Sequence, residues 1–302
     1  MQLEIRNLSK TYSNGVQALK DVSLTIKQGM FGLLGPNGAG KSSLMRTIAT
    51  LQEADSGSIR LTDVATTPGG DLDVLRQKDA VRRVLGYLPQ EFGVYPRVTA
   101  ETMLDHIATL KGIANAGERK DLVAGLLQKV NLYPVRKKNL GTFSGGMKQR
   151  FGIAQALIGN PKLIIVDEPT AGLDPAERNR FHNLLAEIGE NTIVILSTHI
   201  VEDVTNLCSD MAIICLGDVV ATGNPNDLVA DLKGKVFAKM VEKSELDTYR
   251  ATHRVISTQL KTGKTQIHVI ADAPPTGFDT IEPSLEDVYF AKITEKMEVA
   301  TV

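Results

Sequence analysis

The chain has 302 residues, and its 34 Lys and Arg side chains almost balance its 35 Asp and Glu side chains, giving a net charge of −1. Domains that bind duplex nucleic acid usually carry a basic excess, so this balance argues against nucleic acid as a main partner. Hydrophobic residues make up 42% of the chain and aromatic residues only 5%, which is typical of a soluble globular protein with an aliphatic core.

Neither a membrane span nor a secretion signal is predicted. The longest aliphatic and sulfur-containing run, residues 211–216, is far shorter than the ~20 residues that cross a bilayer. The N-terminus lacks the basic start and long apolar stretch of a signal peptide, so we expect a cytoplasmic chain. Cys208 and Cys215 have no His or Cys companions at zinc spacing, which predicts two core cysteines in a reducing compartment.

Alternating and apolar runs predict the strands. Residues 3–8 and 22–26 alternate apolar and polar side chains, which predicts an antiparallel flank with one face in water. Continuous apolar runs follow at residues 30–34, 163–166, 193–196 and 211–216, each before a turn and a helical pattern. Strand and helix in alternation predict a mainly parallel sheet covered by helices.

A glycine-rich loop follows the apolar run at residues 30–34. It fits the phosphate-loop pattern through Gly35, Pro36, Asn37, Gly38, Ala39, Gly40, Lys41 and Ser42. In such a loop, backbone N–H groups surround phosphates, Lys41 reaches the β and γ oxygens, and Ser42 binds Mg²⁺. Ser43 completes the candidate set, and the next helix is expected to place Leu44, Ile48 and Leu51 on one face. A glycine-rich turn without a ligand is the alternative, which the surrounding strand and helix disfavour.

Two carboxylates stand at the end of the apolar run at residues 163–166. Asp167 suits the Mg²⁺ shell, and Glu168 suits polarising the water that attacks a γ-phosphate. Alone, the pair could be a helix cap or a solvated turn. The phosphate loop in the same chain favours the catalytic interpretation. Between about residues 99 and 160 strand patterns disappear, and apolar residues three or four positions apart predict a helical insertion, placed at about 91–160.

The pattern changes again after residue 232. Runs at 255–260 and 265–270 flank a turn with Gly263, which predicts a hairpin. Ser284 to Asp287 form a capping-box variant that begins a helix with one apolar face, Leu285, Val288, Tyr289 and Ile293. We therefore expect an α/β ATPase domain over residues 1–232 and a small α+β domain over 233–302.

The order of these motifs resembles the nucleotide-binding subunit of an ATP-binding-cassette (ABC) transporter over roughly residues 3–230. The signature of that family corresponds to residues 143–147, Phe-Ser-Gly-Gly-Met. Ser144 is also a predicted N-cap, and with Gly145 and Gly146 it gives a second helix start suited to an anion. Phe143 and Met147 depart from the commonest Leu and Gln, and Met147 cannot donate an amide hydrogen bond.

The resemblance assigns further residues by position. It implies that Tyr12 stacks on adenine, that Gln90 contacts Mg²⁺ or the attacking water, and that His199 contacts the γ-phosphate. It places Ala171 to Asp174 in a loop that crosses a dimer interface. An edge tyrosine, a solvated glutamine and a core histidine are the plain structural alternatives for Tyr12, Gln90 and His199.

The family's arrangement is a head-to-tail dimer in which Ser144 to Gly146 of one subunit cover the γ-phosphate held by the other. The resemblance implies a P-loop NTPase core and an ATP-hydrolysing subunit at the inner face of the cell membrane. That subunit would pair as a homodimer, or as a heterodimer with a related ATPase subunit, and drive a separate integral-membrane permease. The signature variant and residues 283–290 resemble the drug- and antibiotic-export branch.

The alternative functions are a soluble cassette ATPase acting on ribosomes or DNA, and a nucleotide-sensing regulatory module. The sequence shows neither two cassettes nor a long coiled coil, and it retains Glu168 and His199.

Overall fold

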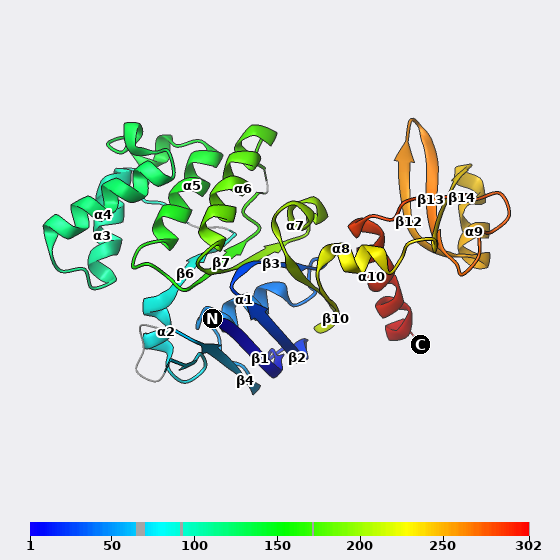
Figure 1. Cartoon of the computed structure of the whole chain (residues 1–302), viewed down its shortest axis with the longest axis horizontal. Helices are drawn as coiled ribbons and strands as arrows, with labels where there is room; N and C mark the ends of the chain where they lie inside the picture. Colours follow the sequence, from blue (N-terminus) through cyan, green and yellow to red (C-terminus); the bar gives the residue numbers. More distant parts are fainter. Residues whose placement is uncertain (65–69, 91–92, 171, 302) are drawn as a thin grey trace.

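The computed structural model describes residues 1–64, 70–90, 93–170 and 172–301. Residues 91 and 92, which open the expected helical subdomain, and Ala171 of the expected interface loop lie outside these ranges. Figure 1 shows a central α/β body with a group of helices on one side and a C-terminal sheet on the opposite side. Within the described ranges, no helix combines the length and the apolarity needed to cross a membrane.

Six strands of the described chain form the central sheet. Their order is β10 (Asp218–Gly223), β9 (Asp210–Cys215), β3 (Gly29–Leu34), β8 (Ile193–Thr198), β7 (Leu163–Asp167) and β6 (Leu85–Leu88). Neighbours from β9 to β6 run parallel, and β10 is antiparallel to β9. The four predicted runs are confirmed as strands of one mainly parallel sheet, whereas the sequence patterns do not predict β6 and β10.

A second, antiparallel sheet covers one face of the central sheet. Its order is β2 (Gln17–Lys27), β1 (Gln2–Thr11), β4 (Ser56–Thr62) and β5 (Leu72–Asp73). Leu3 and Ile5 of β1 and Leu24 and Ile26 of β2 are buried, as their alternation predicts. They share a core cluster with the helix α1 (Lys41–Ile48) and the central sheet. The antiparallel flank is therefore confirmed.

The helix after the glycine-rich loop is shorter than its apolar spacing predicts. Leu44 and Ile48 are buried, but Leu51 is 62% exposed and lies beyond the end of α1. Thr50 takes φ +61, and the N–H of Leu51 donates to the carbonyl of Arg46 at 2.9 Å. A residue in the left-handed conformation directly after the C-cap, with this hydrogen bond, is a common way for an α-helix to end. The prediction that Leu51 shares the buried face is wrong, because the chain reverses at Thr50.

Helices replace strands between β6 and β7, which confirms the predicted helical insertion. They are α3 (Ala100–Leu110), α4 (Ala116–Lys129) and α5 (Gly145–Ala156), with 3-10 turns at Tyr133–Val135 and Leu140–Thr142. The helix α2 (Lys78–Val84) precedes β6, α6 (Pro175–Gly189) follows β7, and α7 (Val201–Leu207) follows β8. The helical insertion therefore begins after β6, the strand at one edge of the central sheet.

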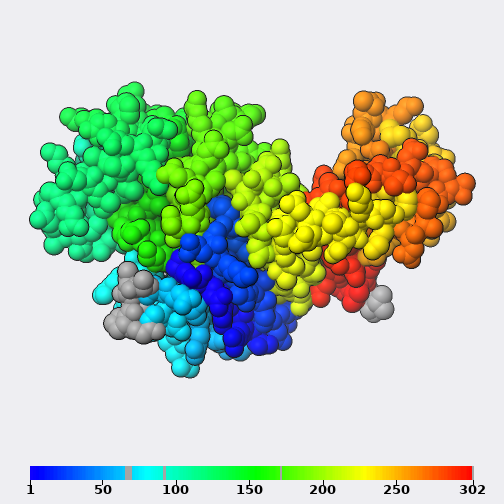
Figure 2. Space-filling model, viewed as in Figure 1, coloured from blue at the N-terminus to red at the C-terminus, as the bar shows by residue number. Residues whose placement is uncertain are grey.

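The C-terminal sheet stands out from the body in the space-filling view (Figure 2). After α8 (Pro225–Ala230), its order is β12 (Arg254–Lys261), β13 (Lys264–Ile270), β11 (Val236–Val241) and β14 (Asp279–Thr280), with α9 (Leu246–Thr252) beside it. Strands β12 and β13 form the predicted hairpin. Thr262 and Gly263 take φ +49 and +81, the left-handed pair that a tight two-residue turn needs.

The last helix, α10 (Leu285–Thr301), returns to the central body. The N–H of Ser284 donates to Oδ2 of Asp287 at 2.8 Å, and the N–H of Asp287 donates to Oγ of Ser284 at 3.3 Å, which confirms the predicted cap. The apolar face predicted for α10 is buried in the same core cluster as Leu196 of β8 and Val204 of α7. Lys296 Nζ also lies 2.8 Å from Asp218 Oδ2 of β10. The division between residues 232 and 233 stays a prediction.

Both cysteines are free and buried in the core, as predicted. Burial, with a smaller contribution from the charge of Asp203, raises the pKa of the Cys208 thiol to about 12. Burial also raises the pKa of Cys215. Both thiols are therefore protonated at neutral pH and poorly reactive.

Candidate active site

A pocket of about 360 Å³ lies at the edge where β3, β7 and β8 end. It is lined by Tyr12, Val16, Ala18, Pro36, Asn37, Gly38, Ala39, Gly40, Lys41, Ser42, Ser43, Gln90, Asp167, Glu168 and His199. The three strands are neighbours and parallel, so the segments after their carboxyl ends meet at one edge. All these residues except Val16 and Ala18 are sequence-predicted site residues. Those two precede the phosphate loop and belong to no motif.

Close backbone packing explains two of the three glycines of the phosphate loop, Gly35 and Gly40. A Cβ on Gly35 would lie 2.4 Å from the carbonyl oxygen of Ile214, so a residue with a side chain does not fit at this position. A Cβ on Gly40 would lie 2.4 Å from the carbonyl oxygen of Ala18, and Gly40 also has φ +112. Because Gly40 is the N-cap of α1, the positive end of that helix faces the pocket. The loop therefore has the form of an anion-binding site.

Lys41 and Asp167 are buried charged groups within this pocket. Lys41 is 6% exposed, and its Nζ donates to the carbonyl oxygens of Gly35 and Pro36. Burial lowers the pKa of Lys41, while the carboxylates of Glu168 and Asp167 act in the opposite direction. Burial raises the pKa of Asp167, while the nearby Ser197 hydroxyl and the positive charge of Lys41 act in the opposite direction. Opposite shifts of this kind are common at functional sites.

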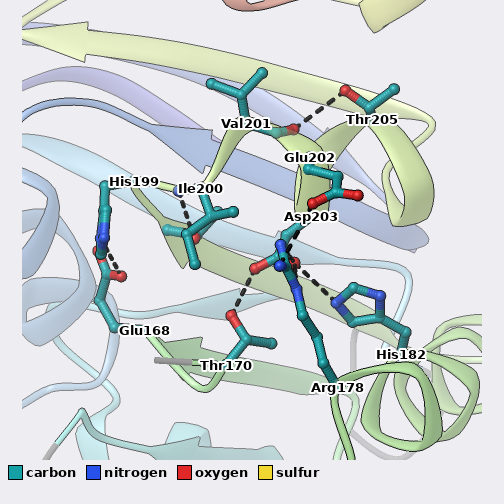
Figure 3. A network of polar contacts seen from close by, with 11 residues as sticks. Glu168, Thr170, Arg178, His182, His199, Ile200, Val201, Glu202, Asp203 and Thr205 are labelled. Carbon is teal, nitrogen blue, oxygen red and sulfur yellow. Dashed lines mark hydrogen bonds and ion pairs between the residues drawn. The ribbon is translucent and has the colours of Figure 1, made fainter. Parts of the chain in front are cut away.

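Glu168 and His199 form a close pair on the segments after β7 and β8 (Figure 3). His199 Nδ1 lies 2.6 Å from Glu168 Oε2, and the N–H of Glu168 donates to the carbonyl of Ser197 at 2.9 Å. Glu168 is 7% exposed and has φ +49, a strained value for an acidic residue. Strain held at the end of a buried strand points to a functional constraint.

Tyr12 and Gln90 lie at the rim of the pocket. The Tyr12 hydroxyl is 2.9 Å from Ser43 Oγ and donates to Gln52 Oε1 at 2.9 Å, which fixes its ring beside the loop. Tyr12 and its pocket neighbour Val16 stay partly exposed, so they offer an apolar surface to a flat ring. Gln90 is exposed and lines the same pocket.

Ser144, Gly145, Gly146 and Asp174 do not line this pocket. Ser144 caps α5 as predicted, and Asp174 caps α6 by accepting the N–H of Glu177 at 2.9 Å. The two helix starts lie together, since a Cβ on Gly146 would lie 2.6 Å from Oε2 of Glu177. The starts of α5 and α6 therefore form one surface, which lies apart from the pocket.

The unusual signature residues are accommodated by packing. Phe143 is buried against Phe151, with ring centroids 6.5 Å apart in an edge-to-face arrangement. Met147 is partly buried against the main core cluster. The side chain of Met147 thus contributes apolar contact where the commoner glutamine would offer an amide.

Sequence reasoning misses a buried polar network behind the Glu168 and His199 pair. Asp203 of α7 is fully buried and contacts Thr170, Arg178 and His182 (Figure 3). Asp203 follows Glu202 in the first turn of a short helix, where acidic side chains are common, so no pattern singles it out.

Comparisons with known proteins agree on one family. The model of the ABC transporter family matches residues 19–171. A linearmycin resistance ATP-binding protein of Bacillus subtilis is 36% identical over 79% of this chain and 74% of that protein. An uncharacterized ABC transporter ATP-binding protein of Synechocystis is 31% identical over 97% of this chain and 85% of that protein.

A solved structure shows the same fold. It is a dimeric, post-hydrolysis ATP-binding cassette bound to ADP and phosphate, with a TM-score of 0.64 and 25% identity. The match covers 74% of this chain and 98% of that one. The predicted P-loop NTPase architecture is confirmed, and the chain belongs to the ABC transporter family as one of its ATP-binding, ATP-hydrolysing subunits.

Proposed function

We propose that ATP binds in the pocket of the phosphate loop and is hydrolysed there by Glu168 and His199. The observation that carries this proposal is the 2.6 Å contact of Glu168 with His199 in the pocket that also holds Lys41. The loop N–H groups and Lys41 bind the phosphates, and Tyr12 stacks on adenine. Glu168 accepts a hydrogen bond from the attacking water, and His199 holds the Glu168 carboxylate in place and contacts the γ-phosphate.

The same pocket suits Mg²⁺. The hydroxyl of Ser42, the carboxylate of Asp167 and the side-chain oxygen of Gln90 all line it, and Mg²⁺ prefers oxygen ligands. Bound there, Mg²⁺ would offset the negative charge of the β and γ phosphate oxygens.

The second surface, at Ser144, Gly145, Gly146 and Asp174, is proposed to cover ATP held by a partner subunit. Ser144 and Gly145 are exposed at the start of α5, so their backbone N–H groups are accessible to an anion. Subunits of this family work as dimers with a membrane permease, and the solved relative is dimeric. We propose a homodimer, or a heterodimer with a related ATPase subunit, at the inner face of the cell membrane.

A groove between the central body and the helical insertion is the proposed permease site. It has a volume of about 670 Å³, and its lining combines Leu85, Tyr87 and Ile107 with charged residues, Asp79, Arg82, Arg83 and Lys111. Leu51 and Leu110 line it while 62% and 73% exposed, an unusual arrangement for two large apolar side chains. A helix from the permease with an apolar face would fill it.

Replacing both Leu51 and Leu110 with aspartate is expected to abolish co-purification with the permease in detergent. Hydrolysis by the isolated subunit should stay within about twofold, because exposed positions are replaced at little cost to folding. Leu260→Asp is the matched control, since Leu260 is 79% exposed on the C-terminal hairpin. Undiminished co-purification of the double variant would rule out this groove.

Export is the proposed direction of transport, on the strength of the relative named for linearmycin resistance. Cells that gain this subunit and its permease should tolerate more linearmycin, whereas cells with the Glu168→Gln subunit should not. The inhibitory concentration in growth assays measures the difference. Equal sensitivity of both strains to linearmycin would contradict export of this class of compound.

A further inference from the structure

One buried carboxylate connects three segments of the hydrolysis site. Oδ2 of Asp203 accepts a hydrogen bond from the Thr170 hydroxyl at 2.6 Å. Oδ1 of Asp203 accepts one from Arg178 Nε at 2.7 Å and lies 2.9 Å from His182 Nε2. Asp203, Thr170 and His182 are 0%, 4% and 7% exposed. Figure 3 shows the three partners around the Asp203 carboxylate.

The partners come from segments that carry different parts of the site. Thr170 follows Glu168 by two residues, on the segment after β7. Arg178 and His182 lie one turn apart on α6, the helix that Asp174 caps. Asp203 follows His199 by four residues. The Asp203 side chain thus connects three segments of the proposed site. They carry Glu168, which orients water, His199, which contacts phosphate, and Asp174, which faces the partner.

Two hydrogen bonds also stabilise the turn between His199 and Asp203. The N–H of Ile200 donates to Thr198 Oγ1 at 3.0 Å, and the N–H of Asp203 donates to the carbonyl of Ile200 at 3.2 Å. These bonds connect the backbone from Thr198 to Asp203, and the 2.6 Å contact connects His199 to Glu168.

Stability alone is a weak reason for such a network. Taking a carboxylate and a guanidinium out of water costs about as much as their attraction returns, and apolar side chains of similar volume often stabilise a fold equally well. Hydrogen bonds to a carboxylate are directional, so Thr170 and Arg178 each fix the position of their own segment relative to Asp203.

We propose that Asp203 is a positioning residue for ATP hydrolysis, holding the Glu168 segment, the His199 segment and the start of α6 in one arrangement. The proposal rests on the proposed roles of Glu168 and His199. When a partner subunit binds over Asp174, a shift of α6 would then change the position of Glu168 through Arg178, Asp203 and Thr170.

The test compares Thr170→Val, which removes one hydroxyl of similar shape, with Thr170→Ser, which keeps it. Thr170→Val should lower kcat about 10-fold to 100-fold with an unchanged KM for ATP, the scale for a small misplacement of catalytic groups. Thr170→Ser should restore kcat. Thr205→Val is the matched control, because Thr205 is an exposed residue on the same helix as Asp203 and its hydroxyl donates to the carbonyl of Val201, one turn earlier. Its kcat should not change.

A double-mutant cycle separates positioning from folding. If Thr170 acts through Asp203, Asp203→Asn should lower kcat, and adding Thr170→Val to it should lower kcat no further. Circular dichroism gives the folded fraction to which each rate is normalised. An unchanged normalised kcat in Thr170→Val, a slow Thr170→Ser, or additive losses in the cycle would each overturn the proposal. Normal hydrolysis by Glu168→Gln would instead overturn the proposed function itself.

Discussion

Glu168→Gln is expected to bind ATP normally and to hydrolyse it about 10²–10⁴-fold more slowly, the scale for a positioned acid or base group. The amide keeps the size and hydrogen-bonding reach of the carboxylate but removes its charge, so the attacking water loses its acceptor. Fluorescent-nucleotide binding and steady-state phosphate release measure the two halves of this result.

The matched control is Glu187→Gln, which changes a carboxylate on the surface of α6 that pairs with Lys129. Exposed pairs of this kind contribute little, so its hydrolysis should equal that of the unchanged protein. Near-normal phosphate release by Glu168→Gln would remove Glu168 from the mechanism. Lost nucleotide binding would show that the carboxylate holds the pocket together.

Ser144→Arg is expected to block ATP-driven dimerisation while each monomer still binds ATP. Ser144 is exposed at the start of α5 and does not line the pocket of its own chain, so the larger cation cannot disturb nucleotide bound there. It would instead occupy the position of the partner's γ-phosphate. Hydrolysis should fall about 10²–10³-fold, as when donors toward developing charge are lost.

Light scattering with ATP, in chains that also carry Glu168→Gln, measures the dimer directly. Asn115→Arg is the control, because Asn115 is likewise an exposed N-cap, on α4. Both variants lose a cap worth about 1 kcal/mol, so only the position of the arginine differs. Dimerisation of Ser144→Arg at the level of Asn115→Arg would place the interface elsewhere.

Local patterns were enough to predict most of the pocket. The phosphate loop, Asp167 and Glu168 each follow an apolar strand, and parallel strands bring their carboxyl ends to one edge. Val16 and Ala18 belong to no motif, and they line the pocket because the start of β2 and the residue before it lie beside the phosphate loop. Leu51 was misplaced because spacing cannot show that Thr50 adopts a left-handed conformation.

Long-range packing was the part beyond prediction. Asp203 meets Thr170, 33 positions away, because the strands β7 and β8 before them are neighbours in the sheet, and it meets Arg178 because α6 packs on α7. The predicted face of α10 was correct, but its neighbours were not foreseeable, since a buried helix face does not specify what covers it. The roles of the individual site residues remain predictions that the substitutions above decide.

The return of α10 to the central body bears on how this protein can be divided into pieces. Lys296 reaches Asp218, and the adjoining Gly217 donates its N–H to the carbonyl of Ala39 in the phosphate loop. A chain cut at residue 232 would therefore leave an apolar strip beside α7 and β9 open to water, close to the nucleotide pocket. The helix α10 therefore stabilises the ATPase body by packing on it. The small C-terminal sheet lies in the chain between α8 and α10, which contact each other.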